Sequence, residues 1–195
     1  MPSHDFLWVG NHPGLDFCNT EPILEDGTVE LLAAPADLQD WLGAAGAASR
    51  SIGWRPSTAT LGWARSLRHA MRDLLDPTVA NPKARQELNA VLAEVPATAA
   101  IGTDGRLELV AGDPDMQLRL DLMCLVVTAT ELDSSRLRRC ANPACVLLFY
   151  DASKSGQRRW HDMSTCGNRA KAAAHYARTR RTRSAASDVA ISPAQ

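Results

Sequence analysis

Apolar residues recur at three- and four-residue spacing along most of the first 132 residues, and this period predicts amphipathic helices. Helices are expected after Pro35, before Pro77, between Pro82 and Pro96, and from Asp115 onward, because proline commonly marks helix boundaries. The last of these is apolar over much of its circumference, which favours a central position in the core. The apolar faces contain Leu38, Trp41, Leu42 and Ala45; Leu61, Ala64, Leu67, Met71 and Leu74; Ala84, Leu88, Val91, Leu92 and Val95; and Leu118, Leu122, Leu125, Val126, Ala129 and Leu132.

The helical period is interrupted between Pro96 and Pro114, where short alternating runs surround Asp104-Gly105. An Asp-Gly pair between alternating runs is typical of a tight hairpin turn. We therefore expect one small two-stranded ribbon within an otherwise helical domain.

A cluster of potential metal ligands lies in the last third of the chain. Four residues separate Cys140 from Cys145, fifteen separate Cys145 from His161, and four separate His161 from Cys166. Two close pairs joined by a spacer are typical of a structural zinc site, so Cys140, Cys145, His161 and Cys166 are predicted to bind one Zn²⁺. The alternative is three ordinary buried thiols and a surface imidazole.

The residues between the two pairs suit a hairpin. The run 146–150 is apolar and β-prone, 151–157 has the composition of a loop, and 158–160 is expected to return as the partner strand. A helix is expected to begin near Cys166. The small residues expected to place this helix against the hairpin are Ala170, Ala174 and Ala177.

These patterns predict a mainly α fold with two parts. With 195 residues, 45% of them apolar, the chain can form one domain of ordinary size and a small additional module. Residues 1–135 are expected to form the helical domain with its hairpin. Residues 136–183 are expected to form a small zinc-stabilised β-hairpin plus helix, and 184–195 a disordered tail.

The distribution of charge supports the same division. Residues 1–135 contain nine Lys and Arg against nineteen Asp and Glu, a net charge of −10, whereas residues 136–183 contain twelve against two, a net charge of +10. A concentrated basic segment is typical of a polyanion-binding surface, although the cluster from 178 to 183 alone could be a solvated tail. The residues expected to contact DNA are Arg158, Arg159, Asn168, Arg169, Lys171, Arg178, Arg180 and Arg181.

Two of these residues allow a second interpretation. Asn168 and Arg169 lie near the expected helix start, where an amide and a guanidinium could read adenine and guanine edges. Asn168 could instead cap the helix, and Arg169 could support the fold beside a zinc ligand.

Short polar residues also gather near the N-terminus. Asn11, His12, Asp16 and Asn19 lie among apolar neighbours and could line a pocket for an effector. They could equally cap helices and satisfy buried backbone groups, which is commoner for such residues at a turn.

The C-terminal pattern resembles the CGNR zinc finger of bacterial transcription regulators. The segment 10–20 resembles the opening of the helical ABATE domain that precedes this finger. The residues that carry the finger resemblance are Cys140-x4-Cys145, Phe149-x-Asp151-x-Ser153, Arg158-Arg159-Trp160, Met163, Cys166-Gly167-Asn168-Arg169-x-Lys171 and Ala174-His175-x-x-Arg178.

The fourth ligand departs from the family pattern. In that family the residue after the tryptophan is usually cysteine, whereas this chain has His161. Imidazole can replace thiolate at zinc, so His161 is the expected ligand. His175 is a rival, but a helix beginning at Cys166 would carry it roughly 13 Å along the axis. Asp162 is nearer but is a poorer partner in a thiolate-rich site.

Together these features predict a cytoplasmic bacterial transcription regulator. Its N-terminal domain would sense an effector or dimerise, its zinc module would bind DNA, and a homodimer is expected. No membrane span or signal peptide is expected, and the cysteines suit a reducing compartment. One alternative is a zinc-stabilised module for protein or RNA contacts. The other is a zinc enzyme, disfavoured because a fourth ligand is available and the deaminase motif is absent.

Overall fold

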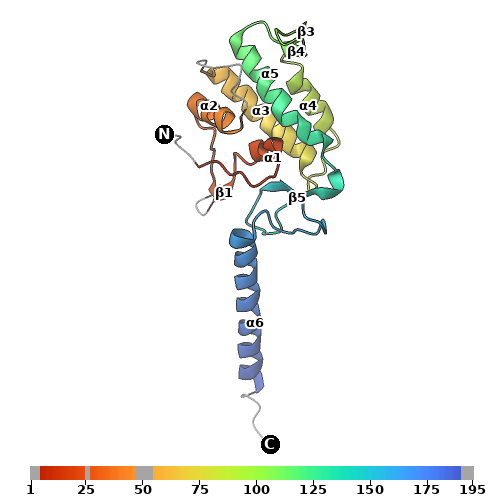
Figure 1. The fold of residues 1–195 in the computed structure, drawn as a ribbon. Coiled ribbons are helices and arrows are strands. Elements are labelled where there is room, and N and C mark those ends of the chain that lie inside the picture. The colour runs from red at the N-terminus through yellow and green to blue at the C-terminus, as the bar shows by residue number, and fades with distance from the viewer. Residues whose placement is uncertain (1–4, 25–26, 47–54, 190–195) are drawn as a thin grey trace, which may run out of the picture.

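A computed structural model describes residues 5–24, 27–46 and 55–189 and confirms the mainly α class (Figure 1). The helices are α1 Pro13–Cys18, α2 Pro35–Ala44, α3 Thr58–Leu75, α4 Ala84–Leu92, α5 Pro114–Val127 and α6 Asn168–Val189. Three antiparallel pairs join β1 Ile23–Leu24 to β2 Gly27–Thr28, β3 Thr98–Ile101 to β4 Leu107–Val110, and β5 Leu137–Arg139 to β6 Leu148–Tyr150. Two 3₁₀ turns, η1 Thr128–Glu131 and η2 Ser134–Arg136, and one π turn, η3 Met163–Gly167, complete the element order.

The predicted helices form close to where the period places them, except that the helix expected to run to Leu132 ends at Val127 and is followed by η1. Ser57 caps α3 by accepting the N–H of Thr60 at 3.0 Å, and Asp113 caps α5 by accepting that of Met116 at 2.9 Å. Such caps satisfy backbone donors that the first turn leaves unpaired. The expected ribbon is β3–β4, in which Ile101 pairs with Leu107 across the Asp-Gly turn.

The short helix α1 lies at the centre of the core. It forms one and a half turns because Pro13 begins the helix and His12 caps it. Leu15, Phe17 and Cys18 are completely buried between α3, α5 and β6. This helix therefore connects the helical domain to the zinc module.

The predicted partner strand of the zinc hairpin is wrong. Strand β6 pairs with β5, which precedes the first cysteine, and residues 158–160 form no strand. The pairing is favoured because it buries Leu137 and Leu148 in the main hydrophobic core. Residues 158–160 instead accept a backbone–backbone hydrogen bond, from the Ala141 N–H to the carbonyl of Arg159 at 2.8 Å.

The last helix is longer and more isolated than expected. It continues to Val189, so residues 184–189, expected in a disordered tail, are helical, and 190–195 lie outside the described residues. The run contains no Gly or Pro before Pro193 and is rich in Ala and Arg, which favour helix. Ala174 is exposed rather than packed on the hairpin, and Figure 1 shows α6 projecting from the body. The side chain of Ala177 is not among those described.

The two predicted parts share their cores. Leu137 and Leu148 from the hairpin belong to the large cluster of the helical domain. Conversely, Leu7 and Val9 from the N-terminal segment pack with Trp160 on the small cluster of Cys140, Cys145, Leu147 and Cys166. The hairpin therefore belongs structurally to both parts. Within the described residues, no helix has the length and apolar character needed to cross a bilayer.

Two glycines make a matched test of this packing. A Cβ at Gly14 would lie 2.6 Å from the Cβ of Ala129 and closer still to the Val126 carbonyl oxygen, whereas a Cβ at Gly62 on the exposed face of α3 meets nothing within 4 Å. We expect Gly14→Ala to lower the free energy of unfolding by about 1–3 kcal/mol through overpacking. Gly62→Ala should raise it by about 0.5–1 kcal/mol. Urea denaturation measures both, and equal effects would contradict the close approach of α1 to α5.

Candidate metal centre

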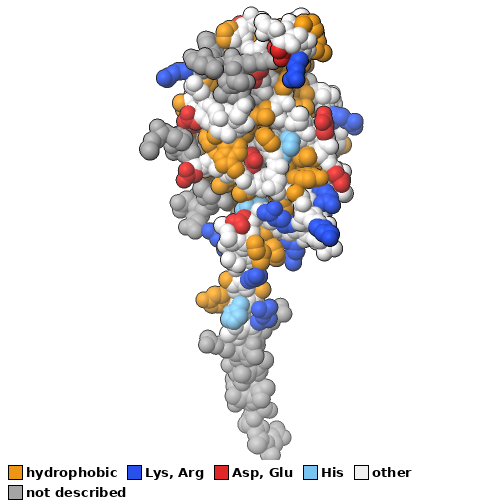
Figure 2. Space-filling view, viewed as in Figure 1, with side chains coloured by type: hydrophobic (Ala, Val, Ile, Leu, Met, Phe, Trp, Pro, Cys, Tyr) orange, Lys and Arg blue, Asp and Glu red, His pale blue; other side chains and the backbone are white. Residues whose placement is uncertain are grey.

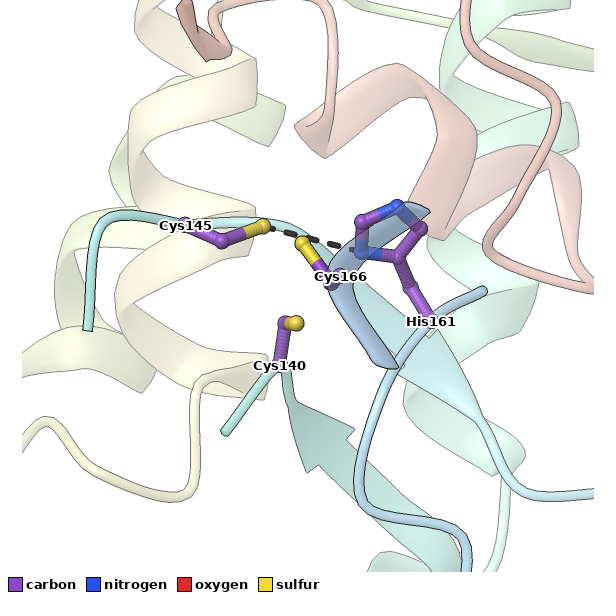
Figure 3. Close-up of side chains that lie close together, drawn as sticks. All are labelled: Cys140, Cys145, His161 and Cys166. Carbon is purple, nitrogen blue, oxygen red and sulfur yellow. Dashed lines mark hydrogen bonds between the residues drawn. The ribbon is translucent and has the colours of Figure 1, made fainter. Parts of the chain in front are cut away.

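The four predicted zinc ligands converge on one point. The Sγ atoms of Cys140, Cys145 and Cys166 and a ring nitrogen of His161 all lie within 4.8 Å of one another, and all four residues are buried (Figure 3). A tetrahedral ion with Zn–S bonds of about 2.3 Å separates its donors by about 3.8 Å, so only small side-chain movements are needed. The donor set fits one structural zinc ion.

Cys140 and Cys145 are presented by the turn that connects β5 to β6. The N–H of Cys145 donates to the carbonyl of Asn142 at 2.9 Å, and the Asn142 Oδ1 accepts the N–H of Ala144 at 3.1 Å. The Asn142 Nδ2 donates to the Sγ of Cys166 at 3.2 Å. One asparagine thus shapes the first turn and hydrogen-bonds a ligand from the second, as residues surrounding metal sites commonly do.

The loop that contains His161 is held by the side chain of Arg158 rather than by strand pairing. The Arg158 guanidinium donates from Nε to the Trp160 carbonyl at 2.9 Å and from Nη2 to the His161 carbonyl. It also lies 5.1 Å from the ring centroid of Phe149, a cation–π arrangement. The buried Asp151 accepts the Arg158 N–H at 2.7 Å. These contacts fix the loop so that Nδ1 of His161 lies 3.6 Å from the Sγ of Cys145.

Cys166 is delivered by the π turn η3. The Asp162 carboxylate accepts the N–H and the hydroxyl of Ser164 at 2.9 and 2.6 Å. These hydrogen bonds cap the turn and engage the carboxylate that was the nearer rival for the metal. A Cβ at Gly167 would collide with the Met163 sulfur, so a larger residue there would displace the end of the exposed Met163 side chain. The other rival, His175, is exposed on α6 and is outside the cluster.

The electrostatics of the four donors favour a bound cation. Burial, followed by the neighbouring Cys140 and Cys166, raises the pKa of Cys145 to about 12. Burial also lowers the pKa of His161, so its imidazole is neutral at pH 7 and available as a ligand. A divalent cation at the centre would stabilise the thiolates that burial otherwise disfavours.

The residues predicted to contact DNA divide into two groups. Arg158 uses its guanidinium inside the module, as described above, whereas Arg159 is exposed and stacks over Trp160 with its Cζ 5.0 Å from the ring centroid. Asn168 donates from Nδ2 to the Ser164 carbonyl at 3.1 Å and is exposed. Arg169, Lys171 and Arg178 are exposed on α6. The backbone at Arg180 and Arg181 is helical, but their side chains lie outside the described residues.

The residues predicted to line an effector pocket have structural contacts instead. His12 Nδ1 accepts the Gly14 N–H at 3.0 Å, and Asp16 Oδ1 accepts that of Gly10 at 2.7 Å. Asn11 Nδ2 donates to the Tyr150 carbonyl at 2.9 Å. The completely buried Asn19 exchanges two hydrogen bonds of 2.9 Å with the backbone of Leu148. These contacts cap α1 and fasten β6 to the helical domain, which is the second of the two interpretations.

Sequence reasoning missed three arginines that secure the zinc module. Arg72 of α3 donates to the Val146 carbonyl at 2.8 Å, and Arg139 of β5 pairs with the buried Asp76 at 3.0 Å. Arg136 donates to the carbonyls of Asp151 and Ser153 at 3.0 and 2.9 Å. No local sequence pattern marks such contacts, because their acceptors are mostly backbone carbonyls distant along the chain.

Comparison with known families gives two matches. A family model for the CGNR zinc finger matches residues 136–179. The model of ABATE, described as a putative stress-induced transcription regulator, matches residues 11–148. The two matches overlap in the β5–β6 hairpin, which also contributes to both hydrophobic clusters. A comparison with curated proteins gave no match.

Asp16 gives a prediction for the pH dependence of stability. Burial raises its pKa to about 6 despite hydrogen bonds from the Gly10 and Val9 backbones, so the folded protein holds this proton more tightly than the unfolded chain. The free energy of unfolding should therefore fall as pH rises from about 4 to about 6. In Asp16→Asn, the part of this pH dependence that comes from Asp16 should be absent when urea denaturation is measured between about pH 4 and pH 6. Asp40→Asn, at an exposed site on α2, should leave the slope unchanged, and equal slopes in all three proteins would contradict the prediction.

The identity of the fourth ligand can be tested with two histidines. Replacing His161 by Ala leaves three thiolates and should lower zinc retention during chelator challenge, whereas His161→Cys should retain one ion per chain. His175→Ala is the matched control and should retain zinc like the unmodified protein. Native mass spectrometry gives the stoichiometry. Zinc loss in His175→Ala but not in His161→Ala would show that the wrong histidine has been assigned.

Proposed function

Because this chain belongs to the ABATE family, whose match covers most of it, and carries a CGNR zinc finger, we propose that it regulates transcription by binding duplex DNA. The proposed contact surface is α6 with the turn that precedes it. A domain of regulator type joined to a zinc finger supports a DNA partner. The further argument comes from the exposure and the charge of α6.

The observation that carries the proposal is a long helix held at one end only. Among the described residues, α6 makes its main contacts with η3, the turn that contains Cys166. Its described side chains from Lys171 to Thr179 are exposed, and Tyr176 is 78% exposed. A helix that is polar on all sides gains no stability from packing, so an isolated helix of this kind is marginal in water. A bound partner would provide the missing contacts.

The charge of this region indicates which class of partner fits. Residues 168–189 contain Arg169, Lys171, Arg178, Arg180, Arg181 and Arg183, and their only acidic residue is Asp188. Figure 2 shows that blue Lys and Arg side chains are denser at the end of the body where α6 begins. An α-helix fits the major groove of B-DNA, and basic side chains on both flanks can reach phosphates on either side. Duplex DNA therefore matches both the shape and the charge of α6.

The zinc ion would set the direction of this helix. Cys166 lies in the turn directly before α6, while Cys140 and Cys145 belong to the hairpin that is fastened to α1. One ion shared by these segments fixes the first turn of α6 relative to the helical domain. In this proposal zinc orients the DNA-binding helix and takes no part in a reaction.

The proposal can be tested with fluorescence anisotropy on fragments selected from a random duplex library. Lys171→Ala and Arg169→Ala should each weaken binding and reduce the slope of log affinity against log salt by about 1, because each removes one phosphate contact. Zinc content should be unchanged. The matched control is Arg85→Ala on α4, also an exposed arginine, which should bind like the unmodified protein.

Each contrary outcome has a separate meaning. If no duplex is selected but structured RNA binds with the same salt dependence, the partner is RNA. If neither nucleic acid binds, the helix is a protein-contact element. If the Lys171 and Arg169 variants bind DNA as tightly as the unmodified protein does, α6 is not the DNA-binding surface.

Three further expectations accompany this proposal. A single finger covers few base pairs, so a homodimer on a two-fold site is expected. A regulator of chromosomal genes would act in the bacterial cytoplasm. A small-molecule effector is also expected. The polar residues predicted to bind it make the structural contacts described above, and a different site is proposed below.

A further inference from the structure

A cavity lies where the helical domain meets the arms of the zinc turn. Its volume is about 290 Å³, and it is walled by the last turns of α3, the β1–β2 hairpin and the two segments that flank the zinc turn. Arg139 and Val146 from these segments are the immediate neighbours of the ligands Cys140 and Cys145. A molecule bound in the cavity would therefore touch both the helical domain and the support of the zinc site.

The cavity contains the guanidinium of Arg72, which forms no ion pair with the described residues. Arg72 donates to the carbonyls of Val146 and Glu21 at 2.8 and 3.4 Å, and no carboxylate oxygen of the described residues lies within 4.0 Å of its guanidinium. Two neutral acceptors use two of the five donors of a guanidinium. Arg139, by contrast, is paired with Asp76 at 3.0 Å. Arg72 is thus available to bind an anionic group.

Two carboxylates in the same cavity are only weakly balanced. The Asp73 carboxylate accepts one hydrogen bond, from the Asn81 amide at 3.3 Å. Glu21 lies 3.7 Å from Arg68 and 3.8 Å from His69, and Arg68 is already engaged by Glu30 at 2.6 Å. Asp73 and Glu21 can therefore accept hydrogen bonds from a cationic group.

The remaining wall of the cavity is apolar and partly open. Ile23 and Val79 are 39% and 40% exposed, which is high for branched aliphatic side chains, and Val146 lies beside them. The volume is at the lower end of the range of about 300–1,000 Å³ for sites that bind drug-sized ligands, so a smaller molecule is expected.

We propose that this cavity binds a small zwitterion, an α-amino acid with an apolar side chain. Its carboxylate would be held by Arg72, its ammonium group by Asp73 and Glu21, and its side chain would cover Ile23 and Val79. A molecule with only one of the two charges would leave a guanidinium or a carboxylate of the cavity desolvated without a partner. This proposal deepens the proposed function by giving an effector its site, and it rests on that function only for the regulatory consequence.

Binding at this place would stabilise the zinc module. The ligand would connect α3 to Arg139 and Val146, each adjacent to a zinc ligand, and so oppose the opening of the zinc turn. Zinc release to a chelator should be slower in the presence of ligand. Because Cys166 lies in the turn directly before α6, the ligand would also stabilise the orientation of α6 relative to the helical domain.

The test is calorimetric titration of the zinc-loaded full chain without DNA. The probes are L-leucine and L-phenylalanine, each compared with the analogue that lacks the amine and the analogue that lacks the carboxylate. At least one amino acid should bind, and each of its analogues should bind at least about tenfold more weakly. Absence of binding by both amino acids, or equal binding of either analogue, would overturn the proposal.

Variants locate the site. Asp73→Asn should weaken binding of the amino acid by at least about tenfold while leaving zinc content unchanged. Arg72→Gln should abolish binding, and because this arginine also supports Val146, Asp73→Asn serves as the variant that preserves the fold. Asp40→Asn and Arg85→Gln are matched surface controls with unchanged affinity. If both Asp73→Asn and Arg72→Gln bind the amino acid as tightly as the unmodified protein does, the ligand lies elsewhere.

The DNA experiment and this titration fail independently. Loss of amino-acid binding with normal DNA affinity rejects the effector site alone. Binding of the amino acid by a protein that selects no duplex supports the site and rejects the DNA proposal.

Discussion

The structure of the C-terminal third depends on the convergence of three thiols and one imidazole in a buried space. Burial raises the pKa of Cys145 to about 12, so thiolates are disfavoured there unless a cation balances them. A small cluster around Cys140, Cys145, Leu147 and Cys166 buries too little apolar surface to hold its turns together alone. One zinc ion would offset two of the three thiolate charges and would join three separate segments of the chain. The start of α6 is fixed through Cys166, and the direction of the proposed DNA-binding helix therefore depends on the same interaction.

The metal module is also fastened to the helical domain by polar side chains that pair with backbone. Asn19 exchanges two hydrogen bonds with Leu148, Asn11 donates to Tyr150, and Arg72 donates to Val146. Such bonds have fixed geometry, and breaking one in a buried place leaves an unpaired polar group. A structural change in the helical domain would therefore affect the zinc module, and the reverse. The cavity beside Arg72 and Arg139 lies at this junction, where a bound molecule could influence both.

The arginines show why net charge describes this chain only in part. The segment after residue 135 has a large positive charge, but Arg136, Arg139 and Arg158 use their guanidinium groups to hold loops and to pair with Asp76. In the described part of this segment, the exposed basic side chains are those of Lys154, Arg159, Arg169, Lys171 and Arg178. Composition records every charge equally, whereas the contacts of the folded chain decide which charges remain available to a polyanion.

The sequence alone predicted helices α2 to α5, the β3–β4 ribbon and the four clustered zinc ligands, because each depends on periodicity, capping or spacing within a short stretch of chain. It also left two interpretations of Asn11 and its neighbours. Only the tertiary structure could choose the capping role, the pairing of β5 with β6 and the exposed position of α6. These features depend on partners far apart in the chain, such as Asn19 and Leu148, and no local pattern specifies which distant backbone a side chain will meet.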